Sequence, residues 1–122
     1  MATISREALI ERAQTRRSAE REIGGLGTVV VRELSVREMS EFRQRSVQAV
    51  DDPLKQSELS CWFATIGLAE PVLAEDDVAL LMDADNSLVE ELCKAIMLYN
   101  GMDIAAAQEQ VEAAKKNSKT TR

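Results

Sequence analysis

Between residues 36 and 100, apolar side chains recur at helical spacing, and caps or helix breakers bound each recurrence. Ser35 and Glu38 form a capping box, in which each side chain can bond the other residue's backbone amide. The box predicts a helix from 36 to about 50, and Pro53 ends it because the residue before a proline avoids helical angles. The inward side of this helix is expected to carry Met39, Phe42, Ser46 and Ala49 or Val50.

Residues 54–68 predict a second helix, which Gly67 and then Pro71 stop. A short helix follows to about Met82, and the acidic residues at its start lie at the positive end of its macrodipole. Four large side chains of the second helix fall within one arc: Leu59, Trp62, Phe63 and Ile66.

Asn86 or Ser87 is expected to cap a long helix, because Ser87 and Glu90 have the spacing of a second capping box. The pair Asn100-Gly101 predicts a left-handed stop at its end. One half of the helical wheel is apolar, with Leu88, Val89, Leu92, Ala95, Ile96 and Tyr99, and the other half carries Glu90, Glu91 and Lys94.

The N-terminal third follows a different pattern. Gly24-Gly25-Leu26-Gly27 predicts a tight turn, because glycine adopts positive φ at no steric cost. Residues 28–34 contain three consecutive valines and favour a strand, with residues 21–23 as its partner in a hairpin over 21–34. Residues 1–20 would make a poor helix, since like charges recur four residues apart, so we expect a loosely docked arm there.

These elements predict one α+β domain that is mainly α-helical, with a small N-terminal β-hairpin followed by a bundle of four to five helices. The core domain spans 21–103, after the arm at 1–20, and 104–122 is expected to form a thin-striped helix and a disordered tail. The longest apolar runs fall far short of the roughly 20 residues that cross a bilayer. No secretion signal is found in the first residues, so the cytoplasm is the expected location.

The chain has no histidine and only two cysteines, which removes most catalytic classes. Ser-His and Cys-His nucleophile pairs are excluded, as are the common zinc, iron and copper ligand sets. Cys61 and Cys93 are expected to be small core hydrophobes. Asp83-Ala84-Asp85-Asn86 is similar to the start of a calcium loop, but Leu88 and Lys94 stand where that loop needs glycine and glutamate. We therefore predict no enzyme, cofactor, metal site or catalytic residue.

Charge is unevenly distributed along the chain, whose net charge is −6. Residues 51–91 contain eleven acidic side chains and only Lys55, a net charge of −10, between flanks of +2 each. This balance argues against a nucleic-acid partner, which requires surplus cations. Two interpretations stay open: an ordinary solvated surface, or an acidic face that meets a basic partner.

Leu98 falls in the middle of the charged side of the long helix, and Met97 borders that side. Exposed Leu and Met near a helix end can form an adaptable binding patch. The alternative is that another helix covers them. The candidate partner-binding residues are Met97, Leu98, Tyr99 and Met102, together with Asp76 and Asp77 from the acidic segment.

Three short motifs occur in a recognisable order and spacing. They are GTVVVRELS at 27–35, IGLAEPVL at 66–73 with Asp76-Asp77-Val78 close behind, and IMLYNGM at 96–102. Over residues 23–103 this order resembles the tail assembly chaperones of long-tailed bacteriophages. In that family a hairpin ending in a similar V-R-E-L-S/T motif precedes helices, an acidic-proline-aliphatic turn and an ending with Asn-Gly.

The resemblance implies a small α+β protein of the host cytoplasm that is absent from the finished virion. Such a chaperone coats the long helical tape-measure protein and helps to recruit tail-tube subunits, without covalent chemistry. Nucleic acid and membranes are not implied as partners, and a homo-oligomer is compatible with the family. Two alternatives stay open: a structural tail or head–tail connector protein of the virion, and a small helical transcriptional regulator.

Overall fold

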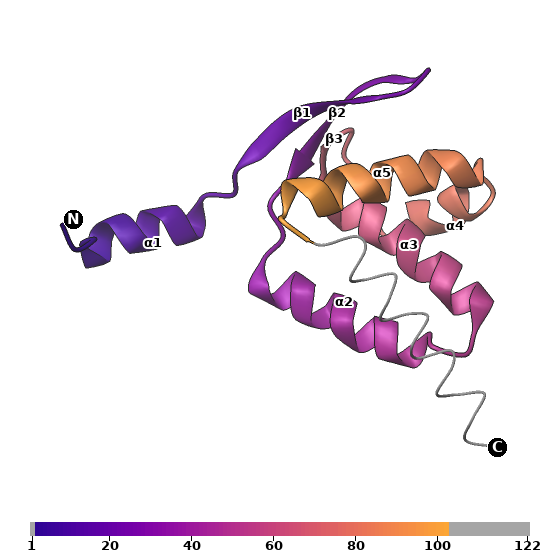
Figure 1. The fold of residues 1–122 in the computed structure, drawn as a ribbon, viewed down its shortest axis with the longest axis horizontal. Helices are drawn as coiled ribbons and strands as arrows, with labels where there is room; N and C mark the ends of the chain where they lie inside the picture. The colour runs from indigo at the N-terminus through magenta and orange to yellow at the C-terminus, as the bar shows by residue number, and fades with distance from the viewer. Residues whose placement is uncertain (1, 103–122) are drawn as a thin grey trace.

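A computed structural model describes residues 2–102, and Figure 1 shows their arrangement. A β-hairpin precedes a group of helices, so the predicted α+β, mainly α-helical class is confirmed. The elements are α1 (Arg6–Gln14), β1 (Ser18–Ile23), β2 (Gly27–Arg32), α2 (Val36–Gln48), α3 (Pro53–Gly67), β3 (Leu68–Glu70), α4 (Asp77–Met82) and α5 (Asn86–Tyr99). The predicted helix at 104–116 and the tail after it lie outside the described residues.

The three strands form one antiparallel sheet in the order β1-β2-β3. The hairpin pairs Ser18 with Arg32 at one end and Ile23 with Gly27 at the other, so β1 begins three residues before the expected residue 21. Gly25 and Gly27 have φ values of 77° and 134°, the positive range that the predicted turn requires. The third strand, β3, pairs with β2 across a register shift and was not predicted.

The helix ends follow local hydrogen bonds. Both bonds of the Ser35–Glu38 capping box are present, at 2.9 and 3.0 Å. At α5, however, the prediction of a cap at Asn86 or Ser87 is wrong. Asp85 is the N-cap, and its carboxylate accepts hydrogen bonds from both the backbone amide and the hydroxyl of Ser87, which leaves no capping box with Glu90. The left-handed stop is confirmed, because Gly101 has φ of 68°.

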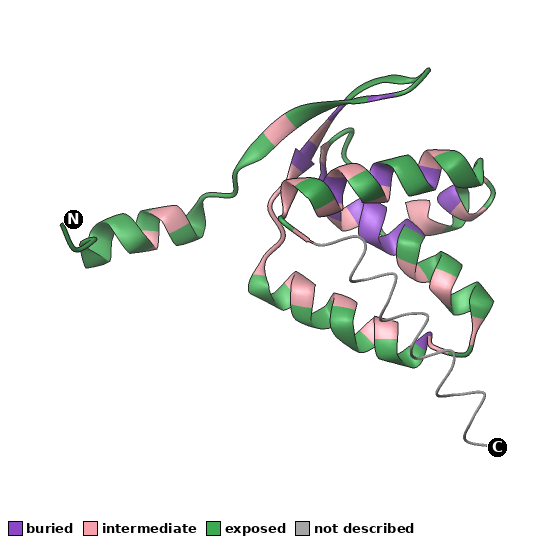
Figure 2. Ribbon diagram, viewed as in Figure 1, coloured by how far each residue is buried: buried purple, intermediate pink, exposed green. Residues whose placement is uncertain are grey.

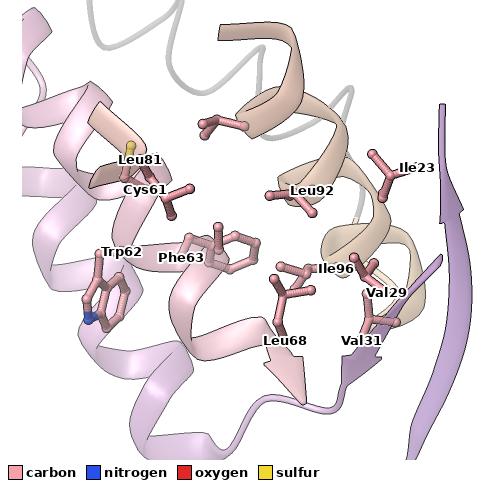
Figure 3. Packing of buried hydrophobic residues seen from close by; sticks show 12 residues of the cluster. Ile23, Val29, Val31, Cys61, Trp62, Phe63, Leu68, Leu81, Leu92 and Ile96 are labelled. Atoms are coloured by element: carbon pink, nitrogen blue, oxygen red, sulfur yellow. The ribbon is translucent and has the colours of Figure 1, made fainter. Parts of the chain in front are cut away.

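The core lies where α3 and α5 pack against one face of the sheet. Figure 3 shows Leu92 and Ile96 of α5 between the β2 valines and Phe63 of α3. Ile96 and Val31 are fully buried. The remaining core residues come from the sheet, α3, α4 and α5: Ile23, Val29, Cys61, Trp62, Ala64, Leu68, Leu81 and Val89. Of the predicted arc on the second helix, Trp62 and Phe63 are buried, whereas Leu59 and Ile66 are partly buried.

Helix α2 packs on α3 from outside this core. The rings of Phe42 and Phe63 have centroids 4.8 Å apart, and the guanidinium of Arg45 lies 4.2 Å from the centroid of the Trp62 ring. The predicted inward residues of α2 are accordingly buried or partly buried, whereas its other face is open to solvent in Figure 2. Within residues 2–102, no helix is both long and apolar enough to cross a membrane.

Candidate functional site

The structure places Leu98 at a groove between the hairpin and α5. Leu98 is 60% exposed, although it is a large aliphatic residue in an ordered helix. We call this the hairpin–α5 groove, and its volume is about 270 Å³. Its lining comes from the tip end of β1 and from one side of α5: Arg21, Glu22, Ile23, Gly24, Glu91, Lys94, Ala95 and Leu98.

The groove combines an apolar base with charged walls. Ile23 and Ala95 are buried or partly buried, whereas Arg21 and Glu22 on one wall and Glu91 and Lys94 on the other are exposed. Each wall thus carries one cation and one anion. Such an arrangement suits a partner segment that presents an apolar stripe flanked by charges of both signs.

The other predicted apolar candidates are less exposed than Leu98. Met97, Tyr99 and Met102 are partly buried and pack against the core. The guanidinium of Arg21 lies 5.5 Å from the centroid of the Tyr99 ring, so the hairpin covers part of that side chain. Only Leu98 of these four presents most of its surface to solvent.

The two acidic candidates lie elsewhere. Asp77 accepts a hydrogen bond from the backbone amide of Ala74 at 2.7 Å, which closes the turn at the start of α4. Asp76 lines a separate hollow between α3 and α4. Of the six predicted residues, therefore, only Leu98 and Asp76 line a surface hollow, and they line different ones.

The two cysteines have the environment of core residues. Burial is the main cause that raises the pKa of Cys61, and burial also raises that of Cys93, to about 12. The Cys93 thiol donates a hydrogen bond to the carbonyl oxygen of Ser60 at 3.2 Å. A thiol with such a raised pKa is protonated at neutral pH and is a poor nucleophile. Among residues 2–102, no His, Cys, Asp and Glu side chains gather in a group suited to a metal ion.

A junction of side-chain hydrogen bonds, which the sequence did not reveal, joins α5 to the sheet and α3. The Asn100 side chain accepts from the Leu34 amide at 2.8 Å and donates to the carbonyl oxygens of Arg32 and Ile96 at 3.1 and 2.9 Å. Arg32 in turn donates from Nε to the carbonyl oxygen of Ile66 at 2.7 Å. We call these five residues the Asn100 junction.

Beside the junction, α3 and α5 approach closely at Gly67. A Cβ atom on Gly67 would lie 2.5 Å from two carbon atoms of the Ile96 side chain. Glycine is required here because a side chain would not fit. Its backbone conformation does not require glycine, since its φ is not in the positive range. The sequence indicated Gly67 only as a helix stop.

No protein-family model, no curated protein and no solved structure matches this chain.

Proposed function

We propose that this protein is a tail assembly chaperone of a long-tailed bacteriophage, which binds and solubilises the tape-measure protein and helps to recruit tail-tube subunits. It would act by reversible binding in the host cytoplasm, without covalent chemistry.

The observation that supports this proposal is the Asn100 junction. The three motifs that carry the family resemblance are far apart in sequence, yet each supplies residues to the junction: Arg32 and Leu34, then Ile66, then Ile96 and Asn100. The junction makes the three motifs one connected unit of the fold, beside the core to which they also contribute. Their meeting is what a family-specific fold signature would produce.

The hairpin–α5 groove fits the task of such a chaperone. A tape-measure protein exposes long apolar stripes between charged residues until the tail tube encloses it. An exposed Leu98 between two walls of mixed charge can cover such a stripe reversibly, because the contact is small and its rim stays hydrated.

The test is co-expression with the tape-measure protein of the same genome, the partner that this proposal requires, followed by measurement of its soluble fraction. We expect the wild-type chain to raise that fraction and Leu98→Glu to abolish most of the gain. Val47→Glu is the matched control, because Val47 is 73% exposed and does not line the groove. Equal loss in both variants, or no gain with the wild-type chain, would contradict the proposal.

The second candidate is a structural tail or head–tail connector protein. It shares the requirement for a protein-binding surface and differs in where the chain ends up. Mass spectrometry of purified virions separates the two, since a connector is present there in fixed stoichiometry and a chaperone is absent.

A further inference from the structure

The second surface hollow lies between α3 and α4, and we call it the α3–α4 hollow. Its volume is about 510 Å³. The base is apolar and is formed by one face of α4, with Val78, Ala79 and Met82. Four carboxylates surround this base: Glu58 of α3, Glu75 and Asp76 before α4, and Asp83 after it.

The carboxylates of this hollow differ from three glutamates of α2 and of the loop between β2 and α2, which are paired. Glu33, Glu38 and Glu41 each form an ion pair with an arginine, at 2.7 to 3.0 Å. Within residues 2–102, the four rim carboxylates form no ion pair and their side chains accept no hydrogen bond. No Lys or Arg from the described part of the chain lines the hollow either.

Among the residues that the structure describes, the hollow thus combines an apolar base with four carboxylates that have no cationic partner. A neutral apolar ligand would leave these charges without partners, whereas a purely cationic ligand would leave the base uncovered. A helix with apolar side chains on one face and lysine or arginine beside them satisfies both parts. The long stems of those cations can also cover apolar surface on the way to the carboxylates.

We propose that the α3–α4 hollow binds a lysine- or arginine-rich amphipathic helix of a partner protein. One or two apolar side chains of that helix lie on Val78, Ala79 and Met82, and its cations pair with the four carboxylates. The proposal does not depend on the proposed function, because it concerns a surface that shares no residue with the hairpin–α5 groove.

The probe is a fluorescein-labelled designed peptide of 14 residues, made of leucine and lysine with all leucines on one helical face. Fluorescence anisotropy measures its affinity for the full chain. We expect saturable binding that weakens as salt is added. A peptide of the same composition, with leucine and lysine scrambled around the helix, is expected to bind at least about fivefold more weakly, since it cannot fill the base and reach the rim together.

Two variants locate the binding. Glu75→Gln with Asp76→Asn removes two rim charges and should weaken binding about threefold to tenfold, the range for two exposed charge contacts. Ala79→Lys places a cation over the base and should abolish binding. Ala79 is exposed, so this variant is expected to keep the wild-type thermal unfolding midpoint.

The matched control is Glu7→Gln with Glu11→Gln on α1, which changes the net charge by the same amount away from the hollow. This control and Leu98→Glu should bind the amphipathic peptide as the wild-type chain does. The proposal is overturned if the α1 variant loses as much affinity as the rim variant, because binding would then follow net charge alone. It is equally overturned if Leu98→Glu abolishes binding while Ala79→Lys does not, or if the scrambled peptide binds as tightly.

Discussion

Helices α1 and α5 both begin with a side-chain cap, yet they contribute to the molecule in opposite ways. Ser5 caps α1 by accepting from the Ala8 amide at 3.1 Å, and Asp85 caps α5 by accepting from the Ser87 amide at 2.9 Å. Helix α5 buries Val89, Leu92 and Ile96, whereas α1 buries no residue at all. In Figure 1, α1 extends to one side of the group formed by the other helices.

The two helices differ in whether they have a continuous apolar side that can pack against the rest of the chain. Helix α5 has a continuous apolar side, so hydrophobic burial holds it against the sheet and α3. Helix α1 has no such side, and the arm that carries it is tied to the body by ion pairs, from Arg12 to Glu33 at 2.7 Å and from Arg16 to Glu38 at 3.0 Å. Caps therefore define where a helix begins, and burial decides whether it is part of the core.

The largest expected effect is at Ile96. Truncation by Ile96→Ala leaves a cavity at a fully buried position and should lower the free energy of unfolding by about 2–5 kcal/mol. Leu98→Ala, two residues along the same helix, should change it by less than about 0.5 kcal/mol because Leu98 is exposed. Urea denaturation measures both. Similar losses in the two variants would contradict the assignment of the buried face of α5.

The second-largest effect on stability is expected at Gly67, where the Ile96 side chain of α5 leaves no room for a Cβ atom on α3. Gly67→Ala should cost about 1–3 kcal/mol of stability, because the new methyl group would overlap the Ile96 side chain. The double variant Gly67→Ala with Ile96→Val should be more stable than the two separate losses predict, since valine removes an atom that the methyl meets. Additive losses in this double-mutant cycle would mean that the two residues do not compete for space.

The third effect is at the Asn100 junction. Asn100→Ala removes three hydrogen bonds and leaves the part-buried Leu34 amide without its partner, which should cost about 1–3 kcal/mol. Asn86→Ala is the control on the same helix, because Asn86 donates only to the exposed Glu90 carboxylate and should lose less than about 0.5 kcal/mol. Hydrogen exchange at the Leu34 amide should accelerate only in the Asn100 variant. Unchanged exchange there would show that another group satisfies this amide.

Local signals explain how much of this fold could be predicted from the sequence. The capping box at Ser35 operates within one helical turn and is confirmed. The predicted arc of α3 is confirmed only in part, because Trp62 and Phe63 are buried but so are Cys61, Ala64 and Thr65 around the rest of the helix. The strand β3 was missed because three residues are too few to show alternation, and its pairing partners in β2 are nearly 40 residues away. The cap of α5 was misassigned because Asp85, Asn86 and Ser87 are all residues that favour the N-cap position.

The candidate surfaces likewise combine features that local sequence patterns predict with features that depend on long-range contacts. The exposure of Leu98 followed from its place among charged residues on one helix, which is a local pattern. The second wall of its groove comes from Arg21 and Glu22, and the position of the hairpin beside α5 depends on tertiary packing. Likewise, the pairing of Asn100 with Leu34 spans 66 residues, a distance at which no periodicity in the sequence indicates contact.

Removal of α1 is expected to have a small effect. A chain lacking residues 2–14 should have a free energy of unfolding within about 0.5 kcal/mol of the full chain's, because α1 buries no residue and its ion pair with Glu33 is only partly shielded from solvent. Urea denaturation of the shortened and full chains is the measurement. A loss above about 2 kcal/mol would show that α1 belongs to the cooperative core, and the comparison with α5 would fail.

The smallest effect concerns the charge that holds the arm. Hydrogen bonds from the Arg12 side chain and then from the Arg17 amide hold the pKa of Glu33 below its ordinary value of 4.5. Because the folded-state pKa is lowered, the ionised carboxylate favours the attached arm above about pH 4.5. This contribution is lost as the pH falls through the lowered value.

The Arg17 amide proton reports this titration directly, since it donates to the Glu33 carboxylate at 2.7 Å. Its NMR chemical shift should move with a midpoint below 4.5 in the full chain. Arg12→Ala should raise the midpoint towards the ordinary value, because it removes the main cause of the lowered pKa, whereas Arg6→Ala should leave it unchanged. If the midpoint is the same in the Arg12→Ala variant as in the full chain, the Arg12–Glu33 ion pair does not tie the arm to the body. The exposed helix would then be joined to the body through β1 and the Arg16–Glu38 ion pair.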